Sequence, residues 1–336
     1  MNRFDYVRPQ TVADAVKAVA GGNARFIAGG TNLVDLMKYN VEQPDRLVDI
    51  TRLPLNAIEA RDGGLSIGAL VTNSTVAYDA QVVERYPLLA SAILAGASGQ
   101  LRNAATTGGN LNQRTRCYYF YDEATPCNKR LPGSGCPAIG GVNRIHAIFG
   151  TSPSCIATHP SDMCVGLAAL DAVVRVAGPE GERTIPFAEY HRLPGDMPER
   201  DTNLKPDEIV LSVDLPDEEF GPHHTYLKLR DRLSYAFALV SVAAVMRLEG
   251  DTIASARFAL GGVAHKPWRD GDAEAFLAGK PATQETFAAA ANIVVAAARP
   301  QSENAFKVEL TRRAIVRGLS QAAVGTPQSQ SDKRIA

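Results

Sequence analysis

All five cysteines of this 336-residue chain fall between Cys117 and Cys164. Most of that stretch, residues 111–160, is rich in glycine, proline and serine and has little helical or strand periodicity. A long loop of this kind inside a domain is usually functional, and something other than an apolar core must hold it in place. We therefore predict an ordered loop whose thiols act together.

The spacing of the cysteines restricts the chemistry of that loop. No C-x-x-C pair is present, which excludes a zinc ribbon and a ferredoxin-type run. An odd number of thiols fits poorly with a full set of disulfides, so we favour a metal site with one spare cysteine. Zinc remains an alternative metal. Cys164 lies in an apolar helical stretch, where a cysteine is commonly a small buried hydrophobe.

Composition narrows the class of protein. Hydrophobic residues make up 45% of the chain and charged residues 21%, which is ordinary for a globular protein of two or three domains. The net charge of −1 argues against a nucleic-acid partner. We expect no secretory signal at the N-terminus and no transmembrane segment. We find no acid–base pair or nucleophilic triad, so we predict no catalytic residues.

Periodicity predicts a mixed α/β organisation in the first two thirds of the chain. Thr11 is a suitable cap for a helix over residues 12–19. Further helices are expected at 33–38 and 87–98, and strands at 25–28, 47–50, 65–69, 168–177 and 208–215.

A domain boundary is expected near residues 216–224. Beyond it, three segments alternate like antiparallel strands, at 225–229, 236–247 and 252–260. Helices are expected at 273–277, 283–298 and 303–320, which makes this a small α+β domain. The polar tail after about residue 325 is expected to be frayed.

Two Gly-Gly segments are typical of anion-binding turns. Ala28, Gly29, Gly30, Thr31 and Asn32 join an expected strand to an expected helix, where glycines allow a phosphate to approach the backbone amides. Thr107, Gly108, Gly109 and Asn110 are interpreted as a second turn of the same kind. Neither matches the Rossmann or Walker pattern, and a plain tight turn is the alternative. Together, the two favour a dinucleotide gripped from both sides.

These residues carry a family resemblance that covers nearly the whole chain. The first turn with Leu33, the second turn with Leu111, and Ser161-Asp162 resemble the flavin contacts of FAD-binding subunits in the xanthine dehydrogenase and molybdenum hydroxylase family. The segments around Lys228 and 258–264 are similar to that family's C-terminal flavoprotein domain. The implied fold class is α+β: an FAD-binding domain of the vanillyl-alcohol-oxidase (PCMH) type, in two subdomains, then a small α+β domain.

The resemblance also implies domain bounds. The FAD-binding domain would span 1–220, with a subdomain boundary near 55 and a cluster-binding loop at 111–160. The C-terminal domain would span 221–325, and 326–336 would be a flexible tail.

The resemblance implies a role for each site residue. Ala28, Gly29, Gly30, Thr31, Asn32 and Leu33 would hold the FAD pyrophosphate, and Thr107, Gly108, Gly109 and Asn110 would line its other side. Ser161 would be a further flavin contact, and Asp162 would bind the ribityl or adenosine portion. Lys228 would lie near the isoalloxazine, where an ammonium stabilises the anionic reduced ring. The alternatives are a helix-capping or turn role for Asp162 and a solvated strand lysine for Lys228.

The cysteine loop resembles that of the aldehyde oxidoreductase branch of the family. The resemblance implies a [4Fe–4S] cluster held by Cys117, Cys127, Cys136 and Cys155. Cys164 is then the expected spare, and a ligand role for it in place of Cys155 is the alternative. Gly133 and Gly135 would donate amide hydrogen bonds to the cluster sulfur.

The function implied is an electron-transfer subunit carrying FAD and a [4Fe–4S] cluster in a molybdenum-dependent aldehyde oxidoreductase. Its partners would be a large molybdenum-cofactor subunit and a small [2Fe–2S] subunit, in a heterotrimer exported to the periplasm on a partner's signal. A cytoplasmic location is the alternative. Other functions remain open: the FAD subunit of a xanthine dehydrogenase or 4-hydroxybenzoyl-CoA reductase, an NAD-linked flavin reductase, a cell-wall reductase, or a zinc-stapled assembly subunit.

Overall fold

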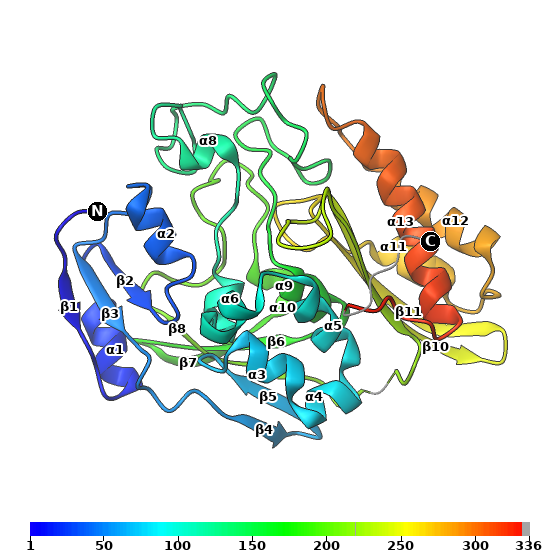
Figure 1. Ribbon diagram of the computed structural model, residues 1–336, viewed down its shortest axis with the longest axis horizontal. Helices are drawn as coiled ribbons and strands as arrows, with labels where there is room; N and C mark the ends of the chain where they lie inside the picture. Colours follow the sequence, from blue (N-terminus) through cyan, green and yellow to red (C-terminus); the bar gives the residue numbers. More distant parts are fainter. Residues whose placement is uncertain (219, 331–336) are drawn as a thin grey trace.

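Three sheets and thirteen helices make up the part of the chain described by the computed structural model, residues 1–218 and 220–330 (Figure 1). The mixture of helices and sheets agrees with the α+β class expected from the sequence. Within the described residues, no helix combines the length and the apolar character needed to cross a membrane.

The N-terminal unit contains a small parallel sheet in the order β1-β3-β2. Its elements are β1 (Asp5–Val7), α1 (Val12–Val19), β2 (Ala24–Ile27), α2 (Leu33–Lys38) and β3 (Arg46–Asp49). The hydroxyl of Thr11 accepts a hydrogen bond from the Asp14 amide, and this cap begins α1 where the sequence predicts it. The predicted helix after the first glycine turn is confirmed as α2.

A five-stranded antiparallel sheet follows, in the order β4-β5-β8-β6-β7. Its strands are β4 (Ile58–Arg61), β5 (Gly64–Gly68), β6 (Val173–Gly178), β7 (Gly181–Pro186) and β8 (Ile209–Leu215). The helices that lie between β5 and β6 are α3 (Asn73–Tyr78), α4 (Ala80–Arg85), α5 (Pro87–Ala95), α6 (Gly99–Ala104), α7 (Thr107–Leu111), α8 (Tyr118–Tyr121) and α9 (Asp162–Ala169). Helix α10 (Phe187–Tyr190) follows β7. The strand expected from residue 168 begins only at Val173, because Ser161 caps α9 and the helix continues to Ala169.

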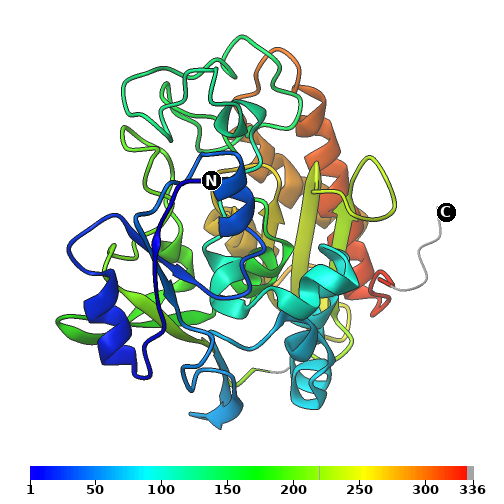
Figure 2. The same cartoon turned by 60° about the vertical axis from the view of Figure 1, so that its left-hand side comes forward.

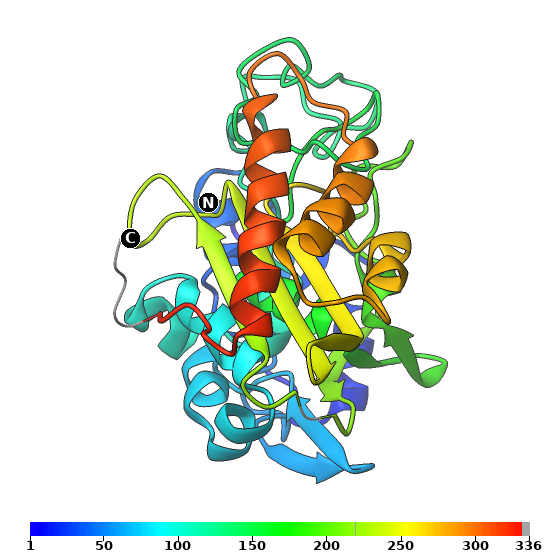
Figure 3. The ribbon, with the colours of Figure 1, turned by 90° about the vertical axis from the view of Figure 1, so that its right-hand side faces the viewer.

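The C-terminal part contains the predicted antiparallel sheet, in the order β11-β10-β9. Its strands are β9 (His224–Leu229), β10 (Val240–Glu249) and β11 (Thr252–Gly261). Figure 3 shows α11 (Gly271–Leu277), α12 (Gln284–Ala296) and α13 (Phe306–Ala323) covering one face of this sheet. Helices α5 and α9, from the N-terminal part of the chain, pack against its strands, so the two parts share an extended contact. Strand β10 begins at Val240, four residues later than predicted.

The cysteine-bearing loop runs over the top of the molecule in Figures 1 and 2 and contains only the single turn of α8. Helix α13 helps to hold it there. The ammonium of Lys307, a fully buried side chain, donates to the carbonyl oxygens of His146 at 2.9 Å and Gly262 at 2.5 Å. The amide of Asn304 donates to the same His146 oxygen. Apolar packing also holds the loop, because Phe120 and Ala157 pack with Leu36 in a buried cluster, so the expectation that the loop lacks an apolar core is wrong.

The predicted tail divides into two parts. Gln328 and Gln330 hydrogen-bond to Thr225 and Tyr226 of β9, so this portion lies along the sheet. Residues 331–336, which belong to the same prediction, lie outside the described residues.

Candidate cofactor sites

A large cavity of about 760 Å³ lies between the N-terminal unit, the helical layer and the C-terminal sheet. This volume is within the range of about 300–1,000 Å³ that is typical of cofactor pockets. Seven predicted site residues line it: Thr31, Asn32, Gly109, Asn110, Ser161, Asp162 and Lys228. The other six predicted residues, Ala28, Gly29, Gly30, Leu33, Thr107 and Gly108, lie behind this wall and do not line the cavity.

The first glycine turn leaves backbone donors available. Gly30 has a φ of +70°, which favours glycine. Gly29 packs so tightly against α6 that a Cβ atom would lie 1.8 Å from the carbonyl oxygen of Ala104. Among the hydrogen bonds of the described residues, the amides from Gly29 to Leu33 have no protein acceptor. The side-chain amide nitrogen of Asn32 is buried without a partner as well. This turn therefore offers the free donors that a pyrophosphate requires.

The sequence predicts a second turn at Thr107–Asn110, and this prediction is wrong: the segment forms the short helix α7. Thr106 caps this helix by accepting from the Gly109 amide. The amides of Thr107 and Gly108 donate to the carbonyl oxygens of Val71 and Ala69, at 2.9 Å and 2.8 Å. Because these donors already have protein partners, α7 contributes Gly109 and the Asn110 side chain to the cavity wall rather than a second cradle of amides.

The structure brings Asp162 and Lys228 together. The Lys228 ammonium lies 2.7 Å from one carboxylate oxygen of Asp162, and the Tyr226 hydroxyl donates to the other at 2.6 Å. Lys228 is therefore not the solvated strand lysine of the alternative prediction: it is 7% exposed and also donates to the Ala95 carbonyl oxygen. Burial and the neighbouring Asp162 carboxylate raise the pKa of Tyr226 well above its usual value. The pair fixes α9 against β9 at the wall of the cavity.

Ser161 links the Asn110 side chain to the start of α9. Its hydroxyl accepts from the Cys164 amide at the start of α9 and donates to the Asn110 side-chain oxygen at 2.5 Å. It thereby fixes α7 relative to α9. The helix-capping role that the sequence left open for Asp162 falls to Ser161.

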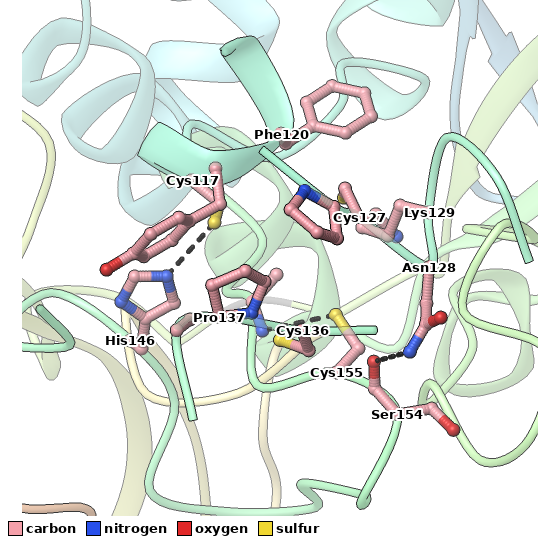
Figure 4. Close-up of a pocket in the computed structure, with 14 residues that line it drawn as sticks. Cys117, Phe120, Cys127, Asn128, Lys129, Cys136, Pro137, His146, Ser154 and Cys155 are labelled. Carbon is pink, nitrogen blue, oxygen red and sulfur yellow. Dashed lines mark hydrogen bonds between the residues drawn. The ribbon is translucent and has the colours of Figure 1, made fainter. Parts of the chain in front are cut away.

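A second, narrower cavity is lined by four of the five cysteines: Cys117, Cys127, Cys136 and Cys155 (Figure 4). Three of the four are buried, and all are free thiols. The space between them, about 10 Å³, is that of roughly one water molecule. The thiols would therefore have to move apart to surround a larger core. Cys164 does not line this cavity; it is fully buried in α9.

Two of the four thiols in this cavity need a nearby cation if they are to ionise. Burial raises the pKa of Cys117 to about 12 and that of Cys155 to about 11. Such thiols stay neutral near pH 7 unless metal ions stabilise the thiolates. The amide of Ala157 donates to the Cys155 sulfur at 3.4 Å. This is the kind of donor expected of Gly133 and Gly135, but the Gly135 amide donates instead to Asn128, and neither glycine lines the cavity.

The sulfur spacing bears on which metal the cavity could hold. In the described part of the chain, which includes all four cysteines, no three of these sulfur atoms lie within 4.8 Å of one another. A single zinc ion with bonds of about 2.3 Å would bring tetrahedral sulfur ligands to within about 3.8 Å. The sulfur atoms are therefore too far apart for one zinc ion as they lie, and the space between them is too small for a cluster.

The two cavities meet at Cys117 and His146, which line both of them. The Nε2 atom of His146 lies 3.1 Å from the Cys117 sulfur (Figure 4). Burial, followed by the charge of Lys307, lowers the pKa of His146 to about 4, so the ring is neutral near pH 7. The sequence places His146 beside the cysteines but gives no sign that it would separate two cavities.

A buried charge network supports the far side of the four-cysteine cavity. Lys129 lines this cavity and pairs with Asp201 at 2.5 Å, while its ammonium also lies 2.8 Å from Nε2 of His265. Arg114 adds a second ion pair to Asp201. Sequence reasoning singled out neither Asp201 nor His265, because each is distant in the chain from every recognised motif.

Comparisons with known proteins agree with this organisation. Residues 2–218 match the family described as the FAD binding domain in molybdopterin dehydrogenase. Residues 224–322 match the CO dehydrogenase flavoprotein C-terminal domain. The predicted fold, an FAD-binding domain followed by a smaller α+β domain, is confirmed.

The similarity to individual relatives extends over almost the full length. The aldehyde oxidoreductase FAD-binding subunit PaoB of Escherichia coli K12 is 51% identical, covering 96% of this chain and 99% of the relative. The carbon monoxide dehydrogenase medium chain of Hydrogenophaga pseudoflava is 29% identical, covering 90% and 89%.

A solved structure shows the same likeness. Carbon monoxide dehydrogenase from Hydrogenophaga pseudoflava superposes with a TM-score of 0.75 at 28% identity, covering 96% of this chain and 98% of that one. The names of these relatives refer to FAD or to carbon monoxide and not to an iron–sulfur cluster. The glycine turn, the large cavity and these matches together show that the chain belongs to the FAD-binding oxidoreductase subunits of the molybdenum hydroxylase family.

Proposed function

We propose that this chain is the electron-transfer subunit of a molybdenum-dependent aldehyde oxidoreductase and carries both FAD and a [4Fe–4S] cluster. Its role is to pass electrons from its partner subunits to an external acceptor. The aldehyde class rests on the 51% identity to PaoB over nearly the whole of both chains. The observation that supports the cluster is that four cysteines, widely separated in the sequence, line one cavity.

The residues of the larger cavity are suited to hold FAD. The free amides of Thr31 and Asn32, the two turn residues that line the cavity, would bind the pyrophosphate, and Asn110 and Ser161 offer polar side-chain atoms elsewhere in the lining. Lys228 holds a positive charge at the wall, paired with Asp162. Bound FAD would supply the exchange between one-electron and two-electron transfer.

The residues of the smaller cavity are suited to hold iron. Cys117, Cys127, Cys136 and Cys155 provide four thiolate ligands, the set that a [4Fe–4S] cluster takes. Such a cluster would supply one-electron transfer. Lys129 places a cationic side chain at the cavity wall, which offsets the negative charge of four thiolates. His146 orients its Nε2 atom toward Cys117, at the boundary with the FAD cavity.

The proposal includes partners and a location. A large molybdenum-cofactor subunit and a small [2Fe–2S] subunit would complete a heterotrimer. Support comes from the family match to molybdopterin dehydrogenases and from relatives named as medium chains. A periplasmic location, reached by export with a signal-bearing partner, is part of the same proposal. Co-purification and cell fractionation would test both parts.

The test of the cluster compares two cysteine variants of the full chain, purified without oxygen. Cys127→Ser removes a proposed ligand, and Cys164→Ser removes the one cysteine outside the four-cysteine cavity. We expect Cys127→Ser to lose most of its iron and acid-labile sulfide and to retain FAD, while Cys164→Ser retains its iron and sulfide. Full iron in Cys127→Ser would contradict the ligand set, and zinc in place of iron in the unmodified protein would contradict the redox role.

A further inference from the structure

Three ligand-type side chains converge away from the four-cysteine cavity. His159 lies in the loop before α9, Cys164 lies in the first turn of α9, and His191 directly follows α10. One ligand atom from each of the three lies within 4.8 Å of the other two. Within residues 1–218 and 220–330, no other group of three or more histidine, cysteine or acidic residues meets this criterion.

The hydrogen bonds of His191 leave one ring nitrogen without a partner. Its Nε2 atom lies 2.9 Å from the Leu111 carbonyl oxygen. Because a carbonyl oxygen only accepts, Nε2 carries the proton and Nδ1 has a free lone pair. That Nδ1 atom is buried without a partner, in a side chain that is only 3% exposed. A buried unpaired acceptor is destabilising, so its presence calls for an explanation.

His159 presents the same feature from the opposite side. Its Nε2 atom is buried and has no hydrogen-bond partner. The thiol of Cys164 therefore pairs with neither imidazole, although all three groups are neighbours. Burial lowers the pKa of His191 to about 4 and that of His159 well below its usual value, which keeps both rings in the neutral form that binds metals.

Aromatic packing fixes the geometry of the cluster. The rings of His159 and His191 have centroids 4.3 Å apart. Phe187 and Tyr190 both pack edge-on against His191, at 5.5 Å and 5.0 Å. The hydroxyl of Tyr190 donates to Asn112, which fixes that ring in turn. Metal-binding histidines are commonly oriented in this way, by a hydrogen bond on the second nitrogen and by packing around the ring.

We propose that His159, Cys164 and His191 bind a single thiophilic d10 cation, Zn²⁺ or Cu⁺. Two imidazole nitrogens and one thiolate suit these ions and exclude Mg²⁺ and Ca²⁺, which prefer oxygen ligands. Metal bonds of about 2.0–2.3 Å require ligand atoms roughly 3.3–3.8 Å apart, so small side-chain rotations close the site. The ion would tie α9 to α10 and fix the loop that presents Ser161 and Asp162 to the large cavity.

The full chain, purified and treated with a chelator, is titrated separately with Zn²⁺ and with Cu⁺ kept reduced, and bound metal is measured by mass spectrometry. We expect about one equivalent of one of these ions per chain. We expect Cys164→Ser and His191→Gln to lower the occupancy at least tenfold at limiting metal. The glutamine can still donate to the Leu111 carbonyl oxygen, so His191→Gln tests the metal ligand with little change to the fold.

Two control variants separate this site from the four-cysteine cavity. Cys127→Ser should leave the zinc or copper occupancy unchanged, whatever its effect on iron. His224→Gln, which alters a buried histidine elsewhere, should leave this occupancy unchanged as well. Bound Co²⁺ should give a thiolate-to-metal absorption band that Cys164→Ser lacks. Absence of zinc and copper binding in the unmodified protein, or equal binding by Cys164→Ser, would overturn the proposal. A loss of iron, rather than of zinc or copper, in Cys164→Ser would also overturn it.

Discussion

The ion pair between Asp162 and Lys228 is the most deeply buried charged contact at the large cavity. The two side chains are 8% and 3% exposed. Removing the lysine leaves a buried carboxylate with only the Tyr226 hydroxyl, and breaking such a pair typically costs about 3–5 kcal/mol. We expect Lys228→Met to lower the free energy of unfolding by that amount in urea titrations.

The exposed pair between Lys205 and Glu180 provides the matched control, since its charged atoms lie 2.5 Å apart but have little burial. Lys205→Met should lower the free energy of unfolding far less than Lys228→Met, because water and salt screen an exposed ion pair. The double variant Asp162→Asn with Lys228→Met should recover part of the loss, because no unpaired charge remains. Equal costs for Lys228→Met and Lys205→Met would show that the buried pair has no special role.

His265 makes the stability of the protein depend on pH. Its Nδ1–H donates to the Arg192 carbonyl oxygen, and its Nε2 accepts from Lys129. Burial and Lys129 lower its pKa from 6.5 to about 4. Between those values the unfolded chain binds a proton that the folded chain does not, so stability falls as pH falls from 6.5 to about 4. The expected loss is about 3 kcal/mol, at 1.4 kcal/mol per pKa unit.

The variant His265→Gln tests this account, since glutamine can make the same two hydrogen bonds and does not titrate. Chemical unfolding at a series of pH values should show a shallower acid dependence for the variant than for the unmodified protein. Identical curves between pH 4 and 6.5 would contradict the assignment.

The first glycine turn has no room for a side chain at Gly29. A Cβ atom at Gly29 would overlap the Ala104 carbonyl oxygen, so the turn and α6 must separate to admit one. We expect Gly29→Ala to lose most of its FAD and to unfold at a lower temperature. Gly22→Ala is the control, since a Cβ atom there meets nothing within 4 Å. Flavin content after gel filtration measures the effect, and full occupancy in Gly29→Ala would remove this turn from the cofactor site.

Helix α7 is an element whose local sequence points to the wrong structure. Two adjacent glycines disfavour a helix by about 1 kcal/mol each, so local propensity predicts a turn. The Thr106 cap and the bonds from Thr107 and Gly108 to Val71 and Ala69 override that preference. A threonine cap is visible in the sequence, but the two carbonyl acceptors come from a distant segment.

At the scale of the whole molecule, the predictable parts are those with strong periodicity. Helices α1 and α12 and the antiparallel strands β9, β10 and β11 follow their apolar patterns closely. The order of the five-stranded sheet is not predictable, because β5 pairs with β8 across more than a hundred intervening residues. Long-range pairing of this kind leaves no local signal.

The same limit applies to the sites. Cys117, Cys127, Cys136 and Cys155 stand out because cysteines are rare and clustered in the sequence. Lys307 and Asp201 hold the loop and support the cavity wall from remote segments, and nothing near them in the chain marks that role. Tertiary structure alone reveals that Cys117 and His146 lie between two cavities.

The central claim is that a cluster and a flavin occupy neighbouring cavities of one chain. The most direct measurement is the content of iron, acid-labile sulfide and FAD in the full chain, purified anaerobically and without partner subunits. The account predicts about four iron and four sulfide per FAD. Protein that is fully loaded with FAD but contains neither iron nor sulfide would contradict it.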